Sequence, residues 1–175
     1  MIALIEARRL VPGALLDVRY AGTRNGFGRA FYPFPALYLL RSTAEKLAAA
    51  QRALEARGLG LELWDGYRPL SVQRLMWALK PDPLYVADPS RGSQHNRGAA
   101  VDLTLVAAGG KKVAMPSDFD DFSAAAAHSG PHAALLRSVM EAAGFRALAE
   151  EWWHYSDPAA ADEPLLDIPF EALGS

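Results

Sequence analysis

The sequence contains no cysteine among its 175 residues. Disulfide bonds and thiolate metal sites are therefore excluded, and any metal ion has to be bound by histidine and carboxylate side chains. No stretch approaches the length of apolar residues that a membrane-spanning helix needs. The formal net charge of −2 argues against a nucleic-acid-binding protein, because neutralising phosphates requires a basic surface.

A recognisable export signal is also missing. Residues 1–9 have no basic region followed by an apolar core and a cleavage site, which predicts a cytoplasmic protein. Hydrophobic residues make up 51% and charged residues 22% of the chain, a composition typical of globular proteins. The length predicts a single domain over residues 1–175 with a sizeable core.

The first clear helix and strand patterns lie next to each other in residues 42–63. Ser42 and Glu45 have the spacing of a capping box at a helix N-terminus, and Gly58 is a stop signal at the other end. Apolar and other residues then alternate over residues 59–63, which predicts a half-buried strand.

Further elements are predicted on both sides of this pair. Apolar spacing of three and four residues predicts helices over residues 72–79 and 131–144, each bounded by proline or glycine. Strands are expected at residues 15–20, 100–105, 111–115 and 150–155. The chain beyond residue 158 is expected to wrap the surface.

Residues 93–102 combine a histidine and an aspartate with small residues between them. His95 and Asp102 are natural ligands of a divalent zinc ion, and Gly98 would let the backbone pass close to it. On a strand, Asp102 points away from the face that carries Leu103 and Leu105. The alternative is that His95 is an ordinary capping or core histidine.

A second polar group follows at residues 151–154. Glu151 and His154 share a face on a helix but point to opposite faces of a regular strand. The two tryptophans between them favour a strand, so both side chains serve one site only if the strand bends or bulges. A surface glutamate beside a core histidine is the alternative.

Arg68 follows the end of a predicted strand and precedes a proline. One interpretation is a surface salt bridge with Asp65. The other is a fixed guanidinium group that stabilises negative charge developing on a substrate oxygen.

Together these motifs resemble the D-alanyl-D-alanine dipeptidases, a group related to zinc D,D-carboxypeptidases and hedgehog-type domains. The run Ser93-x-His95-x-x-Gly98-x-Ala100-x-Asp102 resembles their first zinc motif. Residues 151–154 resemble the second zinc motif, residues 65–69 the arginine motif and residues 115–120 a loop beside the substrate. The resemblance covers residues 17–155, and it implies an α+β fold with helices packed on a small, mainly antiparallel sheet.

The resemblance also implies a role for each matching residue. His95, Asp102 and His154 would bind Zn²⁺ and leave a fourth position for water. Glu151 would act as general base and then as general acid, and Arg68 would polarise the scissile carbonyl.

Two further residues would recognise the substrate. By the same resemblance, Ser93 and Asp120 would read its free amino end. The family usually reads Tyr-Ala-x-x-x-Asn-Phe-x-Gly near the N-terminus, whereas in this chain Tyr20-Ala21 leads to Asn25-Gly26-Phe27-Gly28, with Gly26 at the position of the family's phenylalanine. This departure affects the loop that shapes the dipeptide site.

The leading functional hypothesis is therefore a zinc dipeptidase whose substrate is the D-Ala-D-Ala dipeptide. One alternative is a D,D-carboxypeptidase or another cell-wall peptidase that acts on longer peptides. Another is a zinc-stabilised binding module without catalysis, which would need neither Glu151 nor Arg68.

Overall fold

In residues 4–174, the part of the chain that the computed structural model describes, four α-helices combine with two β-sheets. The larger sheet has the order β2 (Leu15–Leu16), β4 (Leu59–Asp65), β5 (Ala100–Ala107), β8 (Glu151–Ser156), β7 (Arg146–Leu148), and β6 (Lys111–Lys112) also pairs with β5. The β2–β4 pair is parallel, and the other pairs of this sheet are antiparallel. β1 (Leu4–Glu6) and β3 (Tyr38–Leu40) form the smaller, antiparallel sheet. The expected α+β fold with a mainly antiparallel sheet is confirmed.

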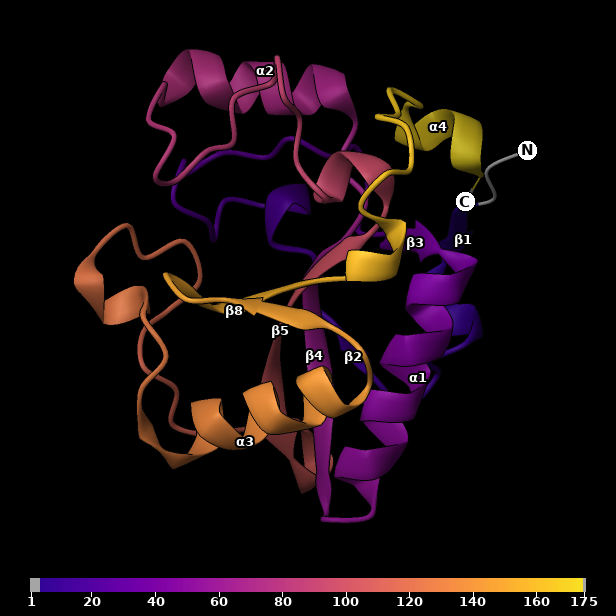
Figure 1. Ribbon diagram of the computed structural model, residues 1–175, viewed down its shortest axis with the longest axis vertical. Helices are drawn as coiled ribbons and strands as arrows, with labels where there is room; N and C mark the ends of the chain where they lie inside the picture. The colour runs from indigo at the N-terminus through magenta and orange to yellow at the C-terminus, as the bar shows by residue number, and fades with distance from the viewer. Residues whose placement is uncertain (1–3, 175) are drawn as a thin grey trace.

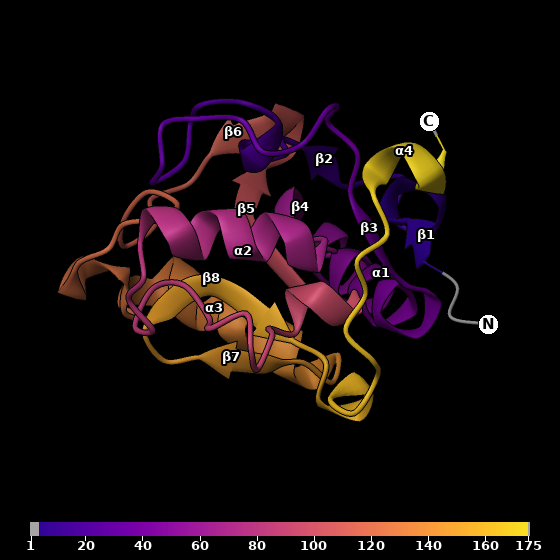
Figure 2. The same cartoon turned by 90° about the horizontal axis from the view of Figure 1, so that it is seen from above.

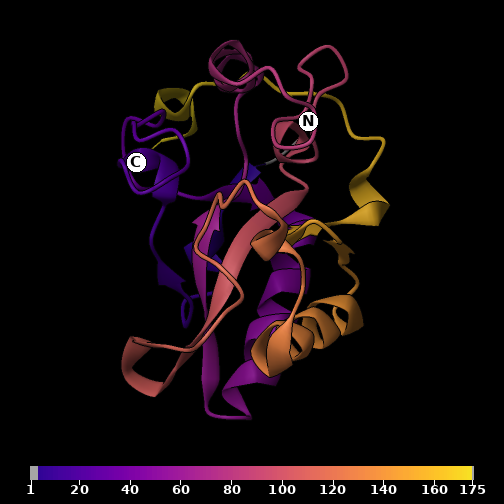
Figure 3. The same ribbon diagram turned by 90° about the vertical axis from the view of Figure 1, so that its left-hand side faces the viewer.

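Helices α1 (Arg41–Glu55) and α3 (Gly130–Ala142) lie side by side on one face of the large sheet (Figures 1 and 3). Strand alternation places Leu61, Leu63 and Leu103 beneath them, where each is 0% exposed. The opposite face therefore carries the polar positions of β4 and β5, and it is this face that holds the site described below.

Helix α2 (Leu70–Leu79) crosses the upper end of the sheet (Figures 1 and 2). The helix predicted over residues 72–79 is confirmed, but its apolar stripe is buried only in part. Met76 is buried, whereas Leu75 is 56% and Leu79 52% exposed. The helix contacts the rest of the molecule along a narrow ridge that includes the buried Gln73, because it covers an end of the sheet and not a face.

The predicted capping box is wrong. Strand β3 runs directly into α1, so Leu40 is the N-cap residue, no side chain caps the helix, and Ser42 already lies inside it. The stop at Gly58 is confirmed, since this residue has a φ of +70° and its N–H donates to the carbonyl of Glu55.

Three other predicted elements differ in extent. The strand expected at residues 15–20 covers only β2, and a 3₁₀ turn, Arg19–Ala21, follows it. The strand expected at residues 111–115 is limited to β6. The C-terminal segment does more than wrap the surface, because Phe170 of α4 (Phe170–Leu173) is 2% exposed and stacks on Tyr32 at 4.4 Å. Within the described residues, no helix is long and apolar enough to cross a membrane.

Candidate active site

Three polar residues form a row across the middle of the large sheet. Asp65 of β4 is the register partner of Asp102 on β5, and Asp102 is in turn the partner of His154 on β8. Directly opposed residues have Cβ atoms about 4.5–5.5 Å apart, so their side chains meet. A register shift between Leu63 and Asp65 puts Asp65, and not Trp64, opposite Asp102.

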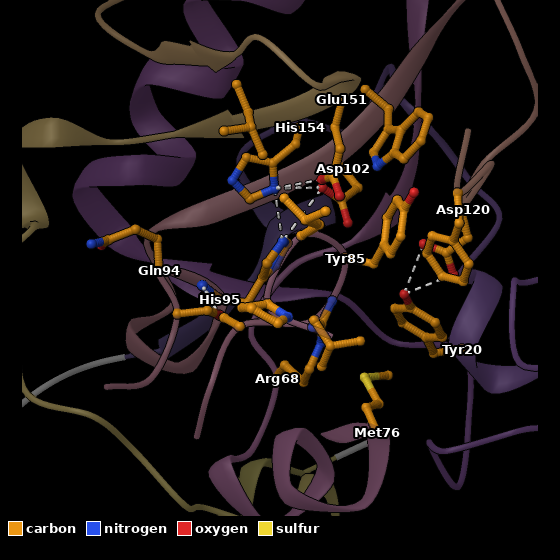
Figure 4. A pocket seen from close by; sticks show the side chains of 18 of the residues that line it. Tyr20, Arg68, Met76, Tyr85, Gln94, His95, Asp102, Asp120, Glu151 and His154 are labelled. Carbon is orange, nitrogen blue, oxygen red and sulfur yellow. Dashed lines mark hydrogen bonds and ion pairs between the residues drawn. The ribbon is translucent and has the colours of Figure 1, made fainter. Parts of the chain in front are cut away.

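His95 adds a second imidazole to this row from a 3₁₀ turn, His95–Arg97, that precedes β5. Its Nε2 atom lies 3.2 Å from Nδ1 of His154 and 3.4 Å from Oδ1 of Asp102, and Nδ1 of His154 lies 3.0 Å from the same oxygen. Figure 4 shows the three side chains converging on one point. The sequence prediction that these residues lie together is confirmed.

The donor set and its spacing fit a tetrahedral divalent metal. Ligands about 2.0–2.1 Å from a tetrahedral zinc ion lie about 3.3 Å from one another, close to the distances among these three atoms. Nδ1 of His95 lies 2.7 Å from the carbonyl oxygen of Gly66. This contact makes Nδ1 the donor, so the lone pair of Nε2 faces Asp102 and His154.

Electrostatics keep the central carboxylate ionised. Burial alone would raise the pKa of Asp102, but the imidazoles of His95 and His154 hold it below its usual range. A carboxylate flanked by two imidazole groups is a suitable set of ligands for a divalent cation.

Glu151 lies beside this group because β8 is irregular. The register shifts along β7 and β8, from Ala147 opposite Tyr155 to Leu148 opposite Glu151. The irregularity that a shared site requires of residues 151–154 is thus present, and Oε2 of Glu151 lies 4.0 Å from Nδ1 of His154. Burial raises the pKa of the Glu151 carboxyl to about 7.

Arg68 is held in the wall of the same cavity. Its Nη2 atom lies 2.6 Å from Oδ2 of Asp65, its Nη1 atom lies 2.9 Å from Oε1 of Gln73, and the guanidinium group lies 5.0 Å from the ring centre of Tyr20. The ion pair with Asp65 therefore exists, but it is buried, with the two side chains 9% and 0% exposed, and not on the surface as one interpretation expected.

Asp120 approaches the cavity from a loop between β6 and α3. Its carboxylate accepts a hydrogen bond from the Tyr20 hydroxyl at 2.9 Å (Figure 4) and another from the N–H of Gly26 at 3.1 Å. Gly26, which departs from the family pattern, thus contacts the residue proposed to read the substrate. A Cβ there would lie 2.5 Å from the ring of Phe122, so the close approach requires glycine.

Ser93 also borders the cavity, and its hydroxyl accepts a hydrogen bond from the N–H of His95 at 3.1 Å. All the residues singled out from the sequence as ligands, catalytic groups or substrate contacts line this one cavity: Arg68, Ser93, His95, Asp102, Asp120, Glu151 and His154.

The interpretation of Gly98 is corrected by its surroundings. This residue has a φ of +69°, and a Cβ there would meet Leu4 at 2.5 Å and the backbone nitrogen of Leu40 at 3.2 Å. The small residue is needed for close packing against β1 and β3, and not for an approach of the backbone to the metal ligands.

Comparison with known proteins identifies the family of this chain. A family model described as peptidase M15, D-Ala-D-Ala dipeptidase, matches residues 2–171. The chain belongs to this family. It is 36% identical to the D-alanyl-D-alanine dipeptidase of Escherichia coli (strain K12), over 97% of this chain and 92% of that protein. It is 32% identical to the D-alanyl-D-alanine dipeptidase of Enterococcus faecium, over 93% of each.

Among solved structures, one of the vancomycin-resistance D,D-dipeptidase VanXYg in complex with a D-Ala-D-Ala phosphinate analogue shares 21% identity with this M15 chain. The match has a TM-score of 0.49 and covers 90% of this chain and 67% of that one.

Two polar residues of this M15 site were missed by the motif reasoning. Asn96 is fully buried, its side-chain amide donates to the carbonyl of Arg68 at 2.8 Å, and its Oδ1 accepts from the N–H of Ser93 at 2.8 Å. Gln73 is fully buried as well. Gln73 lies three positions before Met76, on the apolar side of the predicted helix. A polar residue at such a position is the signal that could have identified it.

Proposed function

We propose that this chain is a zinc peptidase that hydrolyses the D-Ala-D-Ala dipeptide. The observation that carries the proposal is the convergence of a His–Asp–His metal site, a buried carboxyl group and a buried guanidinium group in one cavity. Membership of the M15 family and the names of the relatives from Escherichia coli and Enterococcus faecium support the substrate.

In this proposal His95, Asp102 and His154 hold Zn²⁺. A zinc ion with three protein ligands supplies Lewis-acid polarisation and lowers the pKa of a bound water to about 7. Glu151 accepts a proton from the attacking water and then gives it to the leaving amino group. A buried carboxyl group within reach of the metal-bound water can do both, because general acid–base catalysis needs a group that gains and loses a proton near the operating pH.

Arg68 is proposed to stabilise the negative charge that develops on the carbonyl oxygen. Its side chain is pre-aligned by Asp65 and Gln73, so little reorganisation is needed when the charge forms. The stabilisation is then realised mainly in the transition state and acts on kcat.

Asp120 and Ser93 are proposed to bind the free ammonium group of the dipeptide. An ammonium group that loses its water needs a carboxylate partner, since an unpaired buried charge costs several kcal/mol. Asp120 faces the cavity with its carboxylate already oriented by Tyr20 and Gly26. A peptide whose amino end is acylated lacks the charge that this carboxylate would pair with.

The deciding experiment compares D-Ala-D-Ala with N-acetyl-D-Ala-D-Ala as substrates of the zinc-loaded protein and of a Glu151→Ala variant. We expect the wild type to cleave only the free dipeptide, and the variant to keep stoichiometric zinc but lose nearly all turnover. Efficient cleavage of the acetylated peptide would indicate a carboxypeptidase. Stoichiometric zinc without cleavage of either peptide would indicate a binding module.

Two broader predictions accompany this proposal. The assignment of residues 1–175 to one domain is supported by a continuous core that joins both sheets and the helices. The cytoplasmic location stays a prediction.

A further inference from the structure

Gln73 is a fully buried polar side chain on α2 that makes two different hydrogen bonds. Its Oε1 atom accepts from Nη1 of Arg68 at 2.9 Å, and its Nε2 atom donates to the carbonyl oxygen of Ala87 at 2.8 Å. A guanidinium group can only donate and a carbonyl group can only accept, so the orientation of the amide is determined by its partners. The amide therefore joins the guanidinium group to the chain that follows α2.

That chain is a wall of the cavity. We call residues 81–92 the wall segment, and five consecutive residues in it, Pro83 to Ala87, line the cavity. The segment is organised internally by turns in which the carbonyls of Asp82 and Asp88 accept from N–H groups further on. Among the described residues, 4–174, the bond from Gln73 is the only hydrogen bond that ties the segment to a part of the chain before Lys80 or after Gly92.

We propose that Gln73 is a positioning residue that couples the wall segment to Arg68. One end of its amide keeps the guanidinium group aligned, and the other end sets the place of the cavity wall. The inference rests on the proposed function, because it assigns to Arg68 a role in the reaction. It goes beyond that function in linking the shape of the cavity to the alignment of the charge-stabilising group through a single side chain.

Two substitutions distinguish the hydrogen bond of Gln73 to Arg68 from its hydrogen bond to Ala87. Gln73→Met has a similar length and loses both hydrogen bonds. In Gln73→Glu, an ionised carboxylate keeps an oxygen that accepts from Arg68, but its second oxygen has no proton to donate to the carbonyl of Ala87. The first variant therefore frees both the guanidinium group and the wall segment, whereas the second frees only the wall segment.

The expected results follow from this difference. A catalytic group displaced by about 1 Å can lose on the order of a hundredfold in rate, so Gln73→Met should lower kcat by about ten- to a hundredfold and also raise KM. Gln73→Glu should keep kcat close to the wild-type value and raise KM. Both variants should show faster amide hydrogen exchange in residues 81–92.

Gln51 provides a matched control. It is also a buried glutamine on a helix, and its Oε1 atom accepts from the N–H of Leu61 at 2.9 Å, on the helix-covered side of the sheet. Gln51→Met should lower the melting temperature but leave kcat, KM and exchange in residues 81–92 unchanged.

The proposal is overturned if Gln73→Met behaves like Gln51→Met in kcat and KM, or if Gln73→Glu loses kcat as strongly as Gln73→Met does. If Gln73→Met does not fold, the glutamate variant and its exchange pattern still decide the outcome for the wall segment. A wild-type protein without activity on D-Ala-D-Ala would refute the proposed function, whereas unchanged exchange in both variants would refute the tether independently of activity.

Discussion

The buried pair of Asp65 and Arg68 leads to a quantitative prediction about stability. Asp65 is 0% exposed and accepts two short hydrogen bonds, from Nη2 of Arg68 and from the Tyr32 hydroxyl, both at 2.6 Å. In Asp65→Ala the guanidinium group stays buried without its ionic partner. Breaking a buried ion pair in this way costs about 3–5 kcal/mol, which corresponds to a fall in melting temperature of roughly 10 °C for a chain of this length.

The double variant Asp65→Ala/Arg68→Met isolates the cause of that loss. It has the same small cavity as the single variant but no unpaired charge, so it should regain about 2 kcal/mol or more. Urea unfolding of the wild type and both variants, at one pH and one zinc concentration, measures these differences. The reasoning is refuted if Asp65→Ala loses less than about 1 kcal/mol, the size of a typical exposed pair. It is also refuted if the double variant is no more stable than the single one.

Three further predictions concern the site. Arg68→Ala should lower kcat by about a hundred- to a thousandfold with a smaller change in KM, and a change confined to KM would contradict its role in the transition state. His154→Ala should lose stoichiometric zinc, measured by metal analysis after dialysis, while retention of one zinc per chain would contradict the ligand assignment. Burial raises the pKa of Asp120 to about 6, so the folded protein keeps this proton at pH values where the unfolded chain, with a pKa of about 4, has released it. Stability should therefore fall as the pH rises from about 4 to about 6, and Asp120→Asn should reduce that fall, whereas equal slopes of melting temperature against pH in the two proteins would contradict the assignment.

Several features of this protein are determined locally and could be predicted from the sequence. The helix that stops before Gly58 and the helix before Pro81 depend on residues a few positions apart, because helical hydrogen bonds and caps are short-range. The same holds for the strand around Asp102, whose alternation separates the leucine face from the polar face. The absence of cysteine also limited the possible metal ligands to histidine and carboxylate side chains.

The sequence predicted a bend or bulge in residues 151–154 only as a condition for Glu151 and His154 to serve one site. The spacing of Glu151 and His154 is compatible with a shared site only on a bent strand, and the register shift opposite Leu148 supplies that bend. Which strand lies beside β8, and in which register, depends on pairing between residues far apart in the chain. Alternation along a strand shows which of its residues face the core, but it does not show which distant strand lies beside it.

The surroundings of Arg68 were decided by the tertiary structure alone. The sequence allowed a surface salt bridge between Asp65 and Arg68. Nothing in residues 65–69 reveals that the strands of the large sheet and α2 bury both of these side chains. Gln73 contacts Arg68 only because α2 crosses the end of the sheet, and Gly98 is needed because β1 and β3 pack against it. Burial and close contact between distant segments arise when the core forms, so the sequence determined which chemical groups are present, and the packing of the chain decided which of them meet.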